Sequence, residues 1–145
     1  MRTQVGDALA CEGAHYSVAS VAVCRDAATP WTQFGLSPVG HERDLVLVEV
    51  RGAPFAAGSV EPQWELGAPA VTCGGVTYRL GAQGRAPLEQ EARDGPRRFD
   101  RAQFWLYEGP EGALVLDGQS HAGRFSWVLR PLDPDHLEVY SASGA

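Results

Sequence analysis

The sequence contains no lysine, no isoleucine and no asparagine, so each of its 12 basic residues is an arginine. Codons for these three amino acids are AT-rich, so we expect a bacterial genome of high GC content and attribute the lack of lysine to codon supply. The formal net charge is −6. Binding to nucleic acid relies on basic groups that neutralise phosphates, so we expect no nucleic-acid partner.

Long apolar runs are also absent. No run approaches the roughly 20 apolar residues that a membrane-spanning helix needs. The N-terminal stretch "MRTQVGDALACEG" has no apolar core of signal-peptide length. The sequence therefore predicts no transmembrane segment, and we expect a cytoplasmic chain.

Cysteine is scarce. Cys11, Cys24 and Cys73 are an odd number of residues without Cys-x-x-Cys spacing, too few for a disulfide framework or a zinc knuckle. Free cysteine most often behaves as a small buried apolar side chain. We expect all three to be reduced and largely buried, with a reactive or ligand role as the alternative.

Catalytic motifs are missing as well. The chain has no glycine-rich phosphate loop of known spacing, no Gly-x-Ser-x-Gly and no His-Glu-x-x-His. We therefore expect no catalytic centre and no cofactor. A metal site made by His121 and His136, with Asp133 or Asp135, is a weak alternative to histidines in solvated loops.

The residues that are present favour β-strands. The 17 glycines and 10 prolines lie between short apolar runs, which is typical of turns that join short strands. In "GRFSWVLRPL" at 123–132, Phe125, Trp127 and Leu129 fall on one face of a strand. The best helix candidate, at 86–95, lacks an apolar stripe and fits a charged hairpin strand equally well. We predict an all-β fold of about ten to twelve short antiparallel strands, packed as a small sandwich or a partly open barrel.

One pattern occurs twice. The segments "CEGAHYSV" at 11–18 and "CGGVTYRL" at 73–80 both read Cys-x-Gly-x-x-Tyr-x-aliphatic, and an aromatic and then an aliphatic segment follow each. We interpret the chain as one domain, 1–145, with two weakly repeated meander halves, 5–66 and 67–140. Chance similarity between β-hairpins is the alternative.

Two local features refine this pattern. Glycine takes the positive φ that a tight hairpin turn needs, which places turns at Glu12-Gly13 and Gly74-Gly75. The apolar alternation of the first half changes parity between Val18 and Val21. A β-bulge near residues 19–20 would reconcile the two faces.

The aromatic and glycine marks of the chain resemble those of a bacterial family, domain of unknown function 4178. They are Gly6, Gly13, Tyr16 and Val18; Trp31, Phe34 and Leu36; Gly75, Tyr78 and Leu80; and Phe104, Tyr107, Gly112 and Leu114. The resemblance covers roughly residues 5–140. The aliphatic run at 44–50 departs from the pattern, which has an aromatic residue there. The resemblance implies no activity, and a genomic association with membrane-stress proteins gives no residue a role.

The sharpest charge feature is "RDGPRRFDR" at 93–101, with Asp94 and Asp100 as local counter-charges. Arginine can hold carboxylates with two hydrogen bonds, and exposed aromatic residues favour interfaces. The adjacent Phe104 and Trp105 must face opposite sides of a strand, so one of them covers a second small core or is exposed. The candidate binding residues are Arg97, Arg98, Phe99, Arg101 and Trp105; a merely solvated loop is the alternative.

These features favour a non-catalytic protein-interaction or assembly module. The expected partner is another protein with an acidic surface, and a membrane-associated assembly is one setting for it. The alternative is a small-molecule binder or an enzyme, with its site where the two halves meet.

Overall fold

The computed structural model describes residues 3–40 and 43–140, which form eleven strands and two 3₁₀ turns. The strands are β1 (Ala8–Cys11), β2 (Ala14–Cys24), β3 (Trp31–Pro38), β4 (Leu45–Val50), β5 (Ala53–Ser59), β6 (Ala70–Cys73), β7 (Val76–Ala92), β8 (Arg98–Glu108), β9 (Leu114–Ser120), β10 (Gly123–Pro131) and β11 (Leu137–Tyr140). The turns are η1 (Pro110–Gly112) and η2 (Pro134–His136). The all-β prediction is confirmed. Neither helical turn of the described residues is long enough to cross a membrane.

The strands form a closed antiparallel barrel rather than a partly open one or a sandwich. The sheet runs in the order β11-β1-β2-β3-β4-β5-β10-β9-β8-β7-β6, and an additional pairing of β2 with β7 closes eight of these strands into a ring. Closure depends on β2, whose start pairs with β1 and whose end, Ser20–Cys24, pairs with β7. The change of partner coincides with a register shift between Val18 and Ser20, which confirms the predicted bulge.

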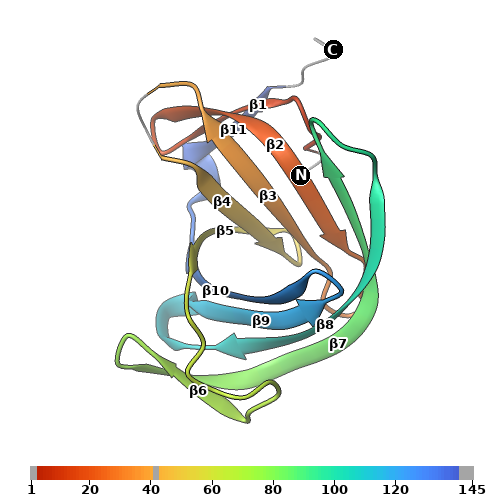
Figure 1. Cartoon of the computed structure of the whole chain (residues 1–145). Coiled ribbons are helices and arrows are strands. Elements are labelled where there is room, and N and C mark those ends of the chain that lie inside the picture. The colour runs from red at the N-terminus through yellow and green to blue at the C-terminus, as the bar shows by residue number, and fades with distance from the viewer. Residues whose placement is uncertain (1–2, 41–42, 141–145) are drawn as a thin grey trace.

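The barrel contains two consecutive meanders with the same strand order. Strands β1 to β5 form the first, in the upper part of Figure 1 with β11, and β6 to β10 form the second below it. The meanders pair at two places, β2 with β7 and β5 with β10. This order is what the repeat hypothesis expects, although superposition of the halves stays a prediction.

Both repeated segments lie on the opening hairpin of a meander. The turn residues Glu12 and Gly13 have φ of 50° and 85°, and Gly74 and Gly75 have 57° and 78°. Two successive positive φ values define the type I′ turn, whose twist matches that of the flanking strands. The predicted hairpin turns are therefore confirmed.

Three apolar clusters pack against the two faces of the sheet. The first cluster fills the lumen of the barrel. Its residues come from all eight barrel strands and include Trp31, Phe104 and Leu129. The second lies against the outer face of the first meander, and the third against that of the second. Neighbours along β8 alternate between clusters, since Phe104 lies in the lumen and Trp105 in the third cluster. Trp105 therefore covers a second small core.

The three cysteines are free thiols. Cys11 and Cys24 are buried, as expected, whereas Cys73 is only half-buried. Burial raises the pKa of the Cys24 thiol to about 11, because the thiolate would lose its hydration in the lumen. At neutral pH this thiol is protonated and a poor nucleophile.

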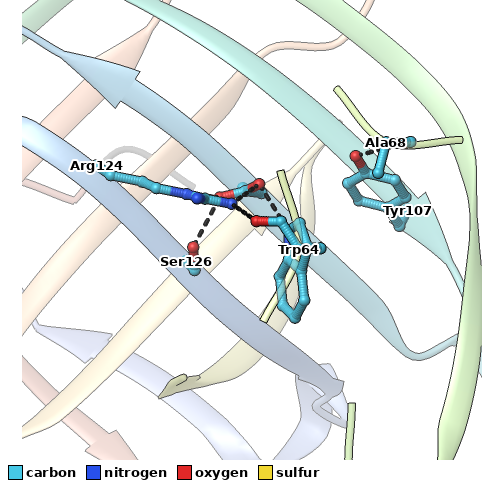
Figure 2. Close-up of polar contacts among 6 residues, drawn as sticks. Trp64, Ala68, Tyr107, Arg124 and Ser126 are labelled. Carbon is cyan, nitrogen blue, oxygen red and sulfur yellow. Dashed lines mark hydrogen bonds and ion pairs between the residues drawn. The ribbon is translucent and has the colours of Figure 1, made fainter. Parts of the chain in front are cut away.

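A buried carboxylate ties the segment between the meanders to the barrel. Asp117 on β9 accepts hydrogen bonds from Trp64 Nε1 at 2.8 Å, Ser126 Oγ at 2.7 Å, Arg124 Nε at 3.1 Å and Arg124 Nη2 at 2.9 Å. Arg124 Nη2 also donates to the Trp64 carbonyl at 3.0 Å (Figure 2). Four residues after Trp64, the carbonyl of Ala68 accepts a hydrogen bond from the Tyr107 hydroxyl at 2.8 Å (Figure 2). Burial, and secondarily the negative charge of Asp117, raises the pKa of Tyr107.

Candidate functional site

A cavity of about 210 Å³ opens at one mouth of the barrel, where residues of both meanders meet. Its wall is formed by Ala22, Trp31 and Gln33 from the first meander and by Leu88, Gln90, Phe125 and Trp127 from the second. The turn between β9 and β10 and the side chain of Arg124 complete its edge. The cavity therefore lies where the sequence placed its alternative site, between the two halves.

Two tryptophans of this wall carry buried indole N–H groups that have no hydrogen-bond partner among the described residues. Trp31 is only 2% exposed, and its ring contacts Phe104 and Phe125 with centroid separations of 6.1 and 5.6 Å. The second tryptophan is Trp127 on β10. A buried polar group without a partner costs about 1–3 kcal/mol. Both N–H groups are covered by protein atoms, so it is the rings of these tryptophans, not their N–H groups, that the cavity presents to a ligand.

Strand alternation explains why polar groups reach this end of an apolar lumen. Trp31 and Gln33 on β3 are two residues apart and share a face, as do Leu88 and Gln90 on β7. Each pair begins with an apolar residue of the lumen and ends with a glutamine in the wall of the mouth. The lumen is thus apolar inside and carries amide groups where it opens.

The β7–β8 hairpin forms part of the surroundings of this mouth. Two further hollows, of about 240 and 450 Å³, share Gln90 with the cavity, and both are lined by Arg98. Arg98 is the cross-strand partner of Gln90, so the two side chains leave the hairpin on the same face. Phe99 and His121 line the larger hollow. The predicted residues Arg98 and Phe99 therefore lie beside the mouth.

Of the other predicted binding residues, Arg101 lies near Arg98 and Phe99, whereas Arg97 and Trp105 lie elsewhere. Arg97 pairs with Glu89 at 3.3 Å and Glu91 at 3.7 Å on the outer side of β7. Arg101 is exposed and lines an open hollow that shares Asp100 and His121 with the hollow beside Phe99. Trp105 is buried in the third cluster. Trp105 therefore cannot contribute to an exposed patch with the hairpin.

The carboxylates that pair with the arginines are not the ones expected from the sequence. Asp100 does not pair with the arginines by its side chain; its carboxylate accepts from the backbone N–H of Arg101 at 2.7 Å and of His121 at 3.0 Å. Glu89 and Glu91 are the carboxylates that face Arg97, and sequence reasoning did not assign them that role.

The histidines of the weak metal alternative lie on different elements. His121 is in the turn between β9 and β10, and His136 is in η2 before β11. Among residues 3–40 and 43–140, no three His, Cys, Asp or Glu side chains gather closely enough to hold a metal ion.

Sequence reasoning missed the wall of the mouth. It assigned Trp31 to the core and gave Gln33 and Gln90 no role. A signal was present, because each glutamine follows an apolar residue at strand period and so continues an inward face. That signal becomes informative only when the inward face of each strand is known.

These features define a closed antiparallel β-barrel with a cavity at one mouth. The chain belongs to the family described as Domain of unknown function (DUF4178), whose model matches residues 4–129. The resemblance drawn from the aromatic and glycine marks is thereby confirmed. Neither a curated protein nor a solved structure matches the chain.

Proposed function

We propose that this protein is a non-catalytic binding domain that holds a small organic molecule in the mouth of its barrel. The observation that carries the proposal is the cavity itself, whose apolar wall of Trp31, Leu88, Phe125 and Trp127 carries the amides of Gln33 and Gln90. Ligand sites are typically apolar hollows with a few placed polar groups, and barrel mouths are a common place for them. The volume of about 210 Å³ is below the usual range for drug-sized ligands, which favours a small metabolite.

A direct test follows the four tryptophan indole N–H signals by NMR while small organic molecules are added. A ligand in the mouth is expected to move the signals of Trp31 and Trp127. The Trp64 signal should stay, since its N–H already donates to Asp117 at 2.8 Å.

The matched variant is Gln90→Leu, which keeps a side chain of similar size in the wall and removes the amide. Loss of one hydrogen bond is expected to weaken binding about five- to tenfold. A library that moves neither signal, or binding that Gln90→Leu leaves unchanged, would contradict the proposal.

Docking of another protein is a second candidate function, and the exposure of Phe99 favours it. This side chain is 75% exposed on the same face of β8 as Arg101, whose guanidinium has no side-chain partner among the described residues. Aromatic and arginine side chains supply much of the energy of protein interfaces. The partner we propose is a cytoplasmic protein with an acidic surface, and a membrane-associated assembly is one setting for it.

The corresponding experiment compares capture of proteins from the native host by wild-type, Phe99→Ala and Val39→Ala baits. Val39 is 73% exposed on another part of the surface and is the matched control. Truncation of an interface hot spot costs about 2 kcal/mol or more, so Phe99→Ala should lose the partner while Val39→Ala keeps it. Equal capture by all three baits would rule out docking through Phe99.

A further inference from the structure

Three adjacent strands place two glutamines on either side of an alanine at the mouth of the barrel. Ala22 on β2 is the register partner of Gln33 on β3 and of Gln90 on β7. Register partners on adjacent strands point to the same side of the sheet. Adjacent strands lie about 4.8 Å apart, so the backbones of the two glutamines are about 10 Å apart. Only the methyl group of Ala22 stands between their side chains.

The next row of partners along the same three strands forms an apolar floor. Trp31, Cys24 and Leu88 are in register with one another, and all three are buried. Phe125 and Trp127 on β10 add aromatic rings to the wall of the cavity. The cavity therefore has an apolar inner part and a pair of amides nearer its opening.

The two amides are accessible and unpaired. Neither Gln33 nor Gln90 has a side-chain hydrogen bond within residues 3–40 and 43–140, and neither is among the side chains whose polar atoms are buried without a partner. They differ in this respect from the indole N–H groups of Trp31 and Trp127, which protein atoms cover. A carboxamide offers two N–H donors and one carbonyl acceptor. The cavity therefore presents both donors and an acceptor to a ligand from each side.

The cavity presents no unpaired charge among the described residues. Arg124 is the one ionisable side chain of its described lining, and its guanidinium pairs with Asp117 at 2.9 Å. Arg98 lies outside this lining, and the two hollows beside the mouth that it lines also contain Glu91 or Asp100. A charged ligand would lose hydration in the cavity without gaining an ion pair, and that loss is costly. The site therefore favours an uncharged ligand.

We infer that the ligand is a small uncharged carboxamide attached to a flat apolar ring. The inference rests on the proposed function. One glutamine donates to the carbonyl oxygen of the ligand, the other accepts from its N–H₂ group, and the ring packs on Phe125 and Trp127. A carboxamide carries its acceptor and its donors on opposite edges of one neutral group, so it complements a glutamine on each side.

The test compares four probes of nearly the same shape by titration of the Trp127 indole N–H signal. Benzamide carries the neutral acceptor and donors, acetophenone lacks the donors, benzoate is an anion and benzamidinium is a cation. We expect benzamide to bind about five- to tenfold more tightly than acetophenone, which is the effect of one hydrogen bond. Benzoate and benzamidinium should also bind more weakly than benzamide, because each buries a charge without an opposite charge.

The decisive variants are Gln33→Glu and Gln90→Glu, with Gln83→Glu as the matched control. A carboxylate in the wall accepts two N–H groups of an amidinium and pairs with its charge, so each of the first two variants should bind benzamidinium more tightly than benzamide. Gln83 is on the same strand as Gln90 but is exposed on the outer face, where its cross-strand partner is Trp105. Gln83→Glu should therefore keep the wild-type order of affinities.

Three results overturn this inference alone: equal binding of benzamide and acetophenone, tighter binding of a charged probe than of benzamide by the wild type, or the wild-type order of affinities in either wall variant. A failure of all four probes to move the Trp127 signal overturns the inference too. The proposed function falls with it only if the wider library also moves neither tryptophan signal.

Discussion

The variant Asp117→Ala is expected to lose about 3 kcal/mol of unfolding free energy, the lower end of the cost of breaking a buried ion pair. Asp117 is 0% exposed and accepts four hydrogen bonds from three side chains. Its removal leaves the Trp64 indole and the Ser126 hydroxyl without this acceptor and the Arg124 guanidinium without its ion pair, although Arg124 Nη2 keeps its hydrogen bond to the Trp64 carbonyl. We take the lower end because the Arg124 side chain is 30% exposed and water can reach part of it.

Two further variants separate the cause of this loss from the cavity that alanine creates. Asp117→Asn keeps the volume but exchanges one acceptor oxygen for an N–H₂ donor that faces other donors, so most of the loss should remain. Asp44→Asn changes an exposed aspartate and should alter stability by less than about 0.5 kcal/mol. Urea unfolding measures all three. Wild-type stability of Asp117→Asn would show that this cluster does not stabilise the barrel.

Replacement of Phe104 by alanine is expected to cost about 3–5 kcal/mol, the usual range for a buried phenylalanine. Phe104 is fully buried in the lumen, and its ring meets Trp31 edge-on at a centroid separation of 6.1 Å. The lumen is enclosed by strands on every side, so the walls can collapse only partly into the space. The cavity and the lost apolar contacts therefore both lower the free energy of unfolding of the variant.

Phe99 gives a matched control on the same strand, because it is the same residue type with its side chain in water. Phe99→Ala should change the free energy of unfolding by less than about 0.5 kcal/mol. The two variants are compared by thermal and urea unfolding under identical conditions. Equal destabilisation of the two would contradict the assignment of Phe104 to the lumen and Phe99 to the surface.

Sequence reasoning predicted the strands and turns of this chain better than its binding residues. The glycine turns and the bulge at Val18–Ser20 were predictable because a positive φ or a change of parity is a local property. The hairpin at 93–101 was singled out for its charge, yet charge alone could not show that Arg97 pairs with Glu89 while Arg98 stays unpaired. Those roles depend on which face of the β7–β8 hairpin each side chain occupies.

The sequence by itself determined the all-β character, the two meanders and the adjacent opposite orientations of Phe104 and Trp105. These follow from alternation and turn chemistry, which act between neighbours along the chain. Only the tertiary structure decided that β2 pairs with β7, and hence that the sheet closes. Backbone pairing between distant strands leaves little trace in residue type, because every residue except proline offers the same N–H and C=O groups. Closure is also what brings Trp31 and Gln33 of one meander to the same cavity as Gln90 and Trp127 of the other.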